Sequence, residues 1–221
     1  HEEWKQQIEE YKEKHPLTYH PKGLTGPYIV EEIYRQTNGD AIITTEVGQH
    51  QMWAAQFYKY TKPRTLLTSG GLGTMGYGLG ASLGAKMGMP DKTVVNIAGD
   101  GCFRMNMNEI ATAARYNIPI IQVVVNNHVL GMVRQWQTLF FNKHYSNTIL
   151  DRKTDFVALA RAFGADGEAV DTVAALDKAF EHAFSCDGPY VIDCRIDKDE
   201  FVLPMLPPGG SMDDIIMKVG E

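Results

Sequence analysis

Two polar motifs in this sequence stand directly after apolar stretches. Gly99-Asp100-Gly101 follows the segment VVNIA, and Asn126-Asn127 follows IIQVVV. The flanking glycines let the backbone turn sharply and let a ligand approach closely. One carboxylate and one amide oxygen suit Mg²⁺, which keeps waters and takes its other ligands from phosphate oxygens. Together the motifs predict a magnesium ion that anchors a diphosphate, whereas either alone is more often a structural turn or strand-end cap.

The elements that must position these motifs alternate along the chain. Val and Ile on both faces of the predicted strands indicate a parallel sheet covered by helices on both sides. The predicted fold class is therefore α/β, doubly wound and mostly parallel, and such sheets bind ligands beyond the carboxyl ends of their strands. We predict strands at 41–48, 64–69, 93–101, 119–127 and 189–196, with helices at 50–60, 73–88, 106–117, 130–141, 155–164 and 172–184.

The two ends of the chain differ from this alternating region. Residues 2–14 predict a charged surface helix, followed by a linker that Pro16 and Pro21 interrupt. Thr25 and Pro27 are typical of the start of a further helix. We therefore predict three parts: an N-terminal helix and linker from a missing preceding domain (1–22), an α/β ligand-binding domain (23–199) and a Pro/Gly-rich C-terminal tail that packs near the site (200–221).

Composition narrows the classes of partner. The 221 residues include 21 basic and 27 acidic ones, a net charge of −6, which argues against nucleic acid or an anionic membrane as the main partner. Three cysteines fit neither a disulfide framework nor a zinc site, which favours a reducing compartment. No apolar run approaches the roughly 20 residues of a membrane span, and no signal peptide is recognisable. Because the chain starts at His1 without Met, we expect its true N-terminus to be missing.

The spacing of the two motifs resembles the thiamine-diphosphate binding motif, in which GDG is followed by about two dozen residues and then by NN. The segments VGQHQMWAAQ, SGGLGTMGYGLG, NNHVLGMVRQWQTLFF and VLPMLPPGG are similar to those of acetohydroxyacid synthase, also called acetolactate synthase. The resemblance runs from about residue 25 onward and is to the C-terminal domain of that three-domain family. It implies thiamine diphosphate and Mg²⁺ as cofactors, with FAD bound mostly by the missing middle domain of the full-length enzyme.

The resemblance also implies roles for single residues. The Asp100 carboxylate, the Asn127 side chain and the backbone carbonyl of Val129 would ligate Mg²⁺. From the residues alone, His50 is equally well read as a structural histidine and Cys102 as a small buried residue. The implied cofactor contacts are Val47, Gly48, Gln49, His50, Gly73, Met75, Gly101, Cys102, Gly131 and Met132.

A substrate pocket is implied as well. Met132 and Trp136 are four residues apart and share a helix face, and by resemblance they line the pocket, where Trp136 favours 2-ketobutyrate as acceptor. Without the resemblance these two residues read as core. The side chain of Met75 is expected to wedge between the two rings of the cofactor, as a soft thioether can.

The implied reaction is decarboxylation of pyruvate and condensation with pyruvate or 2-ketobutyrate, in the biosynthesis of valine, leucine and isoleucine. In the family, the glutamate that activates the cofactor lies in the N-terminal domain of a neighbouring subunit. Glu46 and Glu109 stand in the wrong contexts, so we expect no catalytic residue in this chain and little activity from it alone. Expected partners are a second copy, as a homodimer or higher assembly, and a regulatory small subunit.

Three points stay open at this stage. The location is expected to be cytoplasmic if the source is bacterial, and plastid or mitochondrion if it is eukaryotic. Within the class, another thiamine-diphosphate-dependent 2-oxo acid decarboxylase or carboligase is the alternative, although GMVRQWQ disfavours it. The third possibility is a non-catalytic module that kept the fold.

Overall fold

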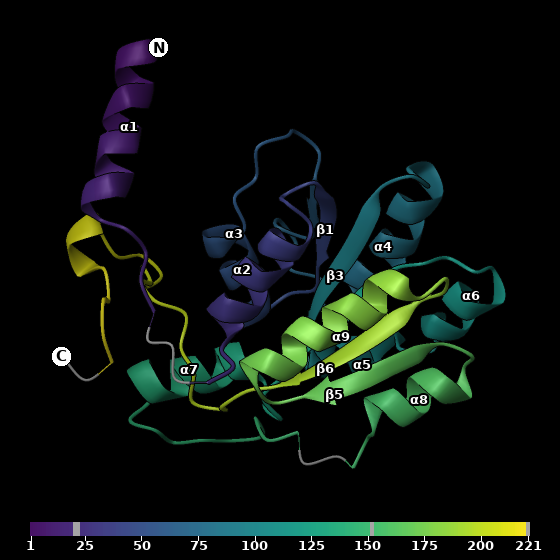
Figure 1. Ribbon diagram of the computed structural model, residues 1–221. Coiled ribbons are helices and arrows are strands. Elements are labelled where there is room, and N and C mark those ends of the chain that lie inside the picture. The colour runs from purple at the N-terminus through teal and green to yellow at the C-terminus, as the bar shows by residue number, and fades with distance from the viewer. Residues whose placement is uncertain (20–22, 151–152, 220–221) are drawn as a thin grey trace.

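A six-stranded sheet forms the centre of the computed structural model, which describes residues 1–19, 23–150 and 153–219 (Figure 1). Every pairing between neighbouring strands is parallel, as predicted. The strand order is β2-β1-β3-β4-β6-β5. The strands are β1 Ala41–Thr45, β2 Leu66–Thr68, β3 Thr93–Gly99, β4 Ile121–Asn126, β5 Asp166–Val170 and β6 Tyr190–Arg195.

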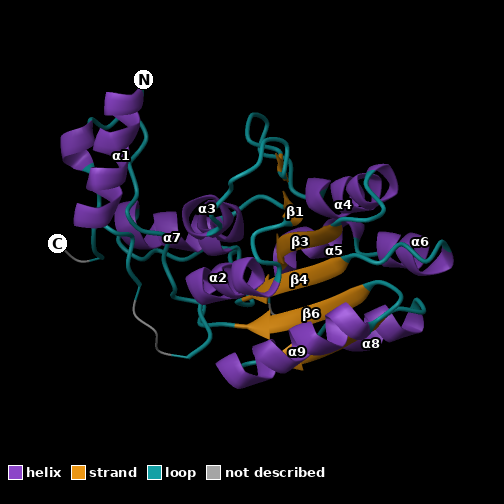
Figure 2. Ribbon diagram, turned by 45° about the horizontal axis from the view of Figure 1, so that its top comes forward, coloured by secondary structure: helices purple, strands orange, loops and turns teal. Residues whose placement is uncertain are grey.

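Helices cover both faces of the sheet (Figure 2), which confirms the doubly wound α/β class. On one face the buried core joins β1, β3, β4 and β6 to α2 (Gly26–Gln36), α3 (Gln49–Phe57) and α9 (Val173–Ser185). A second core lies on the opposite face. Its helices are α4 (Tyr77–Gly88), α5 (Asp100–Asn106), α6 (Glu109–Arg115) and α8 (Phe156–Ala162).

Three further helices complete the described part of the chain. α7 (Gly131–Phe140) follows β4, and a short 3₁₀ helix spans Met212–Asp214. α1 (Glu2–Lys14) has no buried residue and projects away from the sheet (Figure 1). The predicted linker after α1 includes residues 20–22, which lie outside the described ranges. No helix within those ranges has the length and apolar character that a membrane crossing needs.

A row of polar side chains crosses the buried middle of the sheet. Thr44 on β1, Asn96 on β3 and Gln122 on β4 stand opposite one another in the strand register. Thr44 Oγ1 donates to Asn96 Oδ1 at 2.9 Å, and Asn96 Nδ2 donates to Gln122 Oε1 at 2.7 Å. All three side chains are fully buried. The row therefore fixes the alignment of β1, β3 and β4, because buried polar groups are costly unless they are paired.

Some predicted boundaries were wrong. The helix predicted at 73–88 begins only at Tyr77, because Gly73 and Gly76 have positive φ values of 64° and 90° and so leave the helical conformation. The strand predicted to run through residue 101 ends at Gly99, and Asp100 already belongs to α5. Strand β5 was not predicted; it lies at the edge of the sheet, and its DGEAV sequence alternates only weakly between exposed and buried residues.

Candidate functional site

A cavity of about 80 Å³ lies beyond the carboxyl ends of β1, β3 and β4, several times the space that one water needs. It contains all but two of the residues predicted to bind the cofactor, the metal or the substrate; Gly73 and Trp136 do not line it. The predicted residues that line it are Val47, Gly48, Gln49, His50, Met75, Asp100, Gly101, Cys102, Asn127, Val129, Gly131 and Met132.

Asp100 is the most unusual residue of this cavity. Its side chain is 1% exposed, and within the described residues neither carboxylate oxygen has a hydrogen-bond partner. Burial raises the pKa of Asp100 to about 6, and the positive charge of Arg104 and the nearby backbone N–H groups of Asp100 and Gly101, which are not close or aligned enough to count as hydrogen bonds, offset this only in part. A buried carboxylate without a partner costs several kcal/mol when it is ionised. A cation bound in the cavity would remove that cost, so this carboxylate fits a metal site.

Asn127 reaches the same cavity because β3 and β4 are neighbours, with Gly99 opposite Val125 in the register. Its Oδ1 accepts from the backbone N–H of Val129 at 3.1 Å, and its Nδ2 donates to Gln49 Oε1 at 3.3 Å. An amide oxygen has two lone pairs, so Oδ1 keeps one for a cation.

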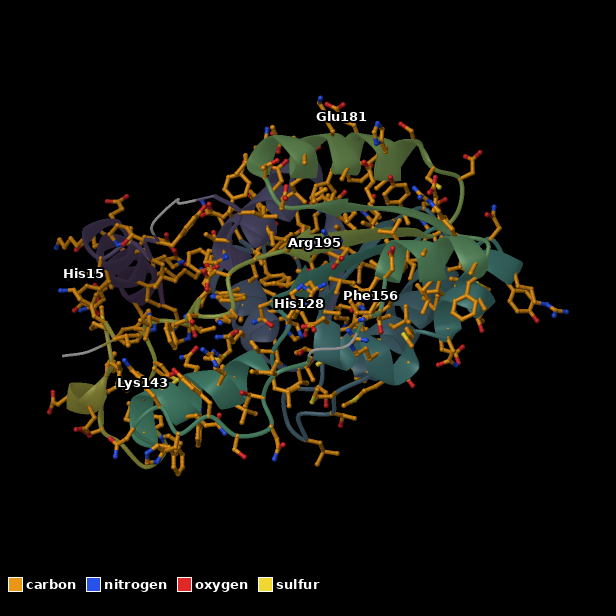
Figure 3. All side chains as sticks on the ribbon, turned by 90° about the horizontal axis from the view of Figure 1, so that it is seen from below. His15, His128, Lys143, Phe156, Glu181 and Arg195 are labelled. Carbon is orange, nitrogen blue, oxygen red and sulfur yellow. The ribbon has the colours of Figure 1, made fainter. Side chains whose placement is uncertain are left out.

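Asn126 has a separate role. Its Nδ2 donates to Asp193 Oδ1 at 2.8 Å, and Arg195 lies 3.6 Å from the other oxygen of that carboxylate. Burial raises the pKa of Asp193, whereas Asn126, Arg195 and His128 lower it. His128 and Arg195 are labelled next to each other in Figure 3, and both act on the Asp193 carboxyl. This polar cluster stabilises the end of β6 and takes no part in lining the cavity.

The described residues contain no group of three or more His, Cys, Asp or Glu side chains that could hold a metal. A zinc-type site of nitrogen and sulfur ligands is therefore not formed by them. The oxygen donors that line the cavity are one carboxylate, side-chain amides and backbone carbonyls, beside the neutral imidazole of His50 and the thiol of Cys102, which already donates to Val47. This oxygen-rich set, with few protein ligands, is the type that Mg²⁺ accepts when phosphate and water complete its coordination.

The opposite wall is formed by the turn between β1 and α3. Gly48 has φ 150°, and Gln49 begins α3, so the free N–H groups of the first helical turn lie beside the cavity.

His50 is 5% exposed, and its Nε2 has no partner within the described chain. Burial lowers the pKa of His50 to about 3, so the ring is neutral near pH 7. A Cβ atom on Gly99 would lie 3.0 Å from this ring, so the glycine makes room for it.

Cys102 faces the same turn from α5. Its Sγ donates to the carbonyl oxygen of Val47 at 3.0 Å, and burial raises the pKa of the thiol to about 12. The thiol is therefore protonated and already bonded, which leaves the backbone N–H of Cys102 as its available donor. Its predicted phosphate contact stays a prediction.

The segment that precedes α4 carries the residues predicted to hold the aminopyrimidine. Gly73 is exposed and donates its N–H to Ser69 at 3.1 Å, whereas Met75 lines the cavity. Sequence reasoning did not identify what fixes this segment. The Glu46 carboxylate, 1% exposed, accepts from the N–H groups of Gly76 at 2.6 Å and Leu79 at 3.1 Å. The sequence did contain a signal for this contact, because a carboxylate follows one strand and a glycine-rich segment begins a later helix.

A second, open hollow of about 700 Å³ runs along α7 and shares Met132 and Val133 with the cavity. Trp136 lies in this hollow with its ring 5.7 Å from that of Phe140, and it is 37% exposed. Met132 and Trp136 are therefore together, as predicted, but only Met132 touches both spaces. The lining residues are Met132, Val133, Trp136, Gln137, Phe140, Phe141, Asn142 and His144.

Comparison with known proteins gives a consistent result. Residues 46–194 match the family described as thiamine pyrophosphate enzyme, C-terminal TPP binding domain. The chain is 41% identical over 219 residues to the acetolactate synthase isozyme 2 large subunit of Escherichia coli (strain K12), covering 98% of this chain and 40% of that protein. It is 43% identical over 222 residues to acetolactate synthase 1, chloroplastic, of Nicotiana tabacum, covering 96% of this chain and 33% of that protein.

A solved structure matches as well. The Rhodococcus jostii RHA1 thiamine diphosphate-dependent 4-hydroxybenzoylformate decarboxylase superposes with a TM-score of 0.75 at 26% identity. The match covers 85% of this chain and 35% of that one. The chain thus spans 33 to 40% of the length of the curated relatives given above.

Proposed function

Since the chain belongs to the family of thiamine pyrophosphate enzymes, as their C-terminal TPP-binding domain, we propose that the Asp100–Asn127 cavity holds the diphosphate of thiamine diphosphate through Mg²⁺. The protein of which this domain is part is proposed to be an acetolactate synthase. It would decarboxylate pyruvate and join the product to pyruvate or 2-ketobutyrate.

The observation that carries the metal assignment is the unpartnered, buried carboxylate of Asp100. A positive charge at the cavity would stabilise the ionised form of that group, and Mg²⁺ supplies two. Asn127 Oδ1 and the backbone carbonyl of Val129 are the proposed further ligands, and phosphate oxygens and water complete the set. The first turn of α3 supplies free N–H groups for the phosphate itself, with no basic side chain required. The neutral His50 ring adds no charge there.

When bound, thiamine diphosphate supplies the carbanion chemistry, and the protein contributes binding, orientation and exclusion of water. Met75 is proposed to orient the cofactor, because its side chain lines the cavity and a Cβ on Gly101 would lie 3.9 Å from its methyl carbon. Gly73 is proposed to bind the aminopyrimidine just outside. FAD, a second copy of the subunit and a regulatory subunit are proposed partners of the whole enzyme.

Two observations favour acetolactate synthase over a simple decarboxylase. Identity to the two acetolactate synthases described above is 41% and 43%, against 26% to the decarboxylase structure. The hollow along α7 also adjoins the cavity through Met132 and Val133 and is lined by aromatic rings. We propose that it receives the second 2-oxo acid, which a carboligase needs and a decarboxylase does not.

Titration calorimetry of the 221-residue chain tests the site. Thiamine diphosphate is expected to bind in the presence of Mg²⁺ and much more weakly in EDTA. Asp100→Asn should abolish the Mg²⁺-dependent binding, whereas Asp171→Asn, at an exposed position, should leave it unchanged. Equal binding by the Asp100 variant and the unmodified chain would show that the metal lies elsewhere.

Product analysis tests the reaction. The chain would be combined with the N-terminal and middle domains of an acetolactate synthase relative, together with pyruvate, Mg²⁺ and thiamine diphosphate. Acetolactate is the expected product. Acetaldehyde in its place would favour the decarboxylase alternative, and intact cofactor binding without any product would favour a non-catalytic module.

A further inference from the structure

A chain of buried side-chain amides connects Asn127 to the segment that follows β6. Asn127 Nδ2 donates to Gln49 Oε1 at 3.3 Å, and Gln49 Nε2 donates to Gln135 Oε1 at 2.9 Å. Gln49 Nε2 also donates to the backbone carbonyl of Glu200 at 2.8 Å. Gln135 Nε2 in turn donates to the carbonyl of Val202 at 3.0 Å, and Val202 N–H donates to Gln135 Oε1 at 2.9 Å. Gln49 and Gln135 are 3% and 1% exposed, respectively.

The row of amides ends at backbone groups, in which the donor and the acceptor have fixed positions. In a side-chain amide, by contrast, a flip exchanges the places of the oxygen and the nitrogen. The carbonyls of Glu200 and Val202 can only accept, so they require Gln49 and Gln135 to present nitrogen to them. The N–H of Val202 requires the oxygen of Gln135. With its nitrogen committed, Gln49 presents oxygen to Asn127, and Asn127 must then turn its nitrogen toward Gln49.

The opposite edge of the Asn127 amide is therefore oxygen. That oxygen accepts the N–H of Val129, which requires the same orientation. If the Asn127 amide were flipped, its NH₂ group would face the N–H of Val129, and its oxygen would face the side-chain oxygen of Gln49. It would also offer a cation an NH₂ group, which is no ligand.

The backbone of α7 leaves room for this arrangement at one position. A Cβ atom on Gly131 would lie 2.0 Å from Gln49 Oε1 and 2.7 Å from Asn127 Nδ2. Gly131, the first residue of α7, therefore lies directly against the hydrogen bond between the Gln49 and Asn127 amides. Any larger residue at this position would displace one of these two side chains.

We propose that Gln49 and Gln135 are positioning residues. The backbone carbonyls and N–H of the segment from Glu200 to Val202 fix the orientation of these two amides. Gln49 in turn fixes the orientation of Asn127, so that Asn127 offers its oxygen to the metal. This inference rests on the proposed function, because it assigns the metal ligand role to Asn127. It gives Gln49 a role different from a direct contact with the diphosphate. It also predicts that docking of residues 200–202 and binding of Mg²⁺ stabilise each other.

A double-mutant cycle on Mg²⁺ affinity, measured by calorimetry at saturating thiamine diphosphate, separates positioning from a general structural effect. Gln49→Met removes the acceptor for Asn127 and should weaken Mg²⁺ binding roughly 10-fold or more. Gln135→Met should give a smaller loss of the same sign. Gln36→Met is the matched control on α2; the Gln36 side chain donates to Glu32 Oε1 at 2.6 Å and lines neither the cavity nor the hollow, so affinity should not change.

The decisive background is Asn127→Asp, because a carboxylate has oxygen on both edges and needs no orientation. In that background Gln49→Met should leave Mg²⁺ affinity within about twofold, so the two substitutions are not additive. A loss of equal size in both backgrounds, or no loss in the single variant, overturns the proposal. If Asp100→Asn leaves Mg²⁺ binding intact, the metal site itself is refuted; if it abolishes binding while Gln49→Met has no effect, only the positioning role fails.

Hydrogen exchange provides a readout independent of affinity. Mg²⁺ with thiamine diphosphate should slow exchange of the Val202 N–H in the unmodified chain, because metal binding and docking of this segment support each other. The slowing should disappear in Gln49→Met, although Gln49 makes no bond to Val202. Slowing of the same size in both proteins would contradict the coupling.

Discussion

The carboxylate of Glu46 accepts a 2.6 Å hydrogen bond from the backbone N–H of Gly76. The residue that directly follows strand β1 thereby holds the beginning of α4, and the Leu79 N–H adds a second bond to the same carboxylate. Backbone N–H groups at a helix start have no partner within the helix. Glu46 satisfies two of them inside the protein and so fixes the segment that carries Met75 beside the cavity.

Glu46→Ala is expected to destabilise the chain by about 1–3 kcal/mol, because buried N–H groups lose their acceptor. The change would be measured as the shift in the free energy of unfolding in urea. Glu181→Ala serves as control, since Glu181 is exposed on α9 (Figure 3) and its loss should matter by less than about 0.5 kcal/mol. Equal midpoints for the two variants would refute the capping role.

Asp100→Asn is expected to have opposite effects on stability and binding. Without metal, the variant should be more stable than the unmodified chain by about 1–3 kcal/mol near neutral pH, because an uncompensated buried charge is removed. Urea denaturation in EDTA measures this difference. A less stable variant would mean that the carboxylate has a stabilising partner in the metal-free protein.

Glu200 should make stability depend on pH. Burial raises the pKa of its carboxyl to about 7, and the N–H of Gly26 offsets only part of this. Because the pKa of Glu200 is higher in the folded state than in the unfolded state, the protonated carboxyl stabilises the fold. This contribution is fully present below the unfolded-state pKa, near 4.5, and is lost as pH rises through the folded-state pKa of about 7. Glu200→Gln stays neutral, so it should match the unmodified chain at pH 4 and exceed it by on the order of 1–3 kcal/mol at pH 8. Parallel stability curves would contradict the assignment.

Two glycine substitutions should have opposite effects. Gly84→Ala lies in the interior of α4, where an added Cβ meets nothing within 4 Å, and should stabilise by about 0.5–1 kcal/mol. Gly131→Ala adds the same methyl group at the start of α7, but against Gln49 and Asn127, and should lower both stability and Mg²⁺ affinity. Thermal denaturation and calorimetry of the two variants check this. A Gly131 variant with unchanged affinity would mean that α7 shifts away at little cost.

Trp136→Leu tests the proposed acceptor site. In the assembled enzyme, supplied with pyruvate and 2-ketobutyrate together, the variant should form a smaller share of the product derived from 2-ketobutyrate. Loss of the indole removes one of the three aromatic side chains, with Phe140 and Phe141, that line the hollow along α7. Phe163→Leu, at an exposed position just beyond the end of α8, is a control that also replaces an aromatic ring with leucine but does not line the hollow. An unaltered product ratio would remove Trp136 from substrate selection.

The sequence predicted the fold where its signals were local and periodic. Apolar strands between amphipathic helices implied the parallel sheet, and Asp100 and Asn127 were expected at one rim because each follows such a strand. Partners that depend on three-dimensional proximity were not predictable in this way. Gln135 reads as one polar residue of an amphipathic helix, yet it is 1% exposed and bonded to Val202. Glu46 lies far in sequence from the N–H groups that it caps.

The polar row of Thr44, Asn96 and Gln122 has a consequence for how the chain reaches its native state. A slip of β3 by one residue would turn Asn96 toward the other face of the sheet and leave the Thr44 hydroxyl and the Gln122 oxygen without partners in an apolar core. Each orphaned group costs about 1–3 kcal/mol. Mispaired sheets are thus disfavoured by side chains that do not line the cavity, so this preference for one strand alignment needs no bound metal or cofactor.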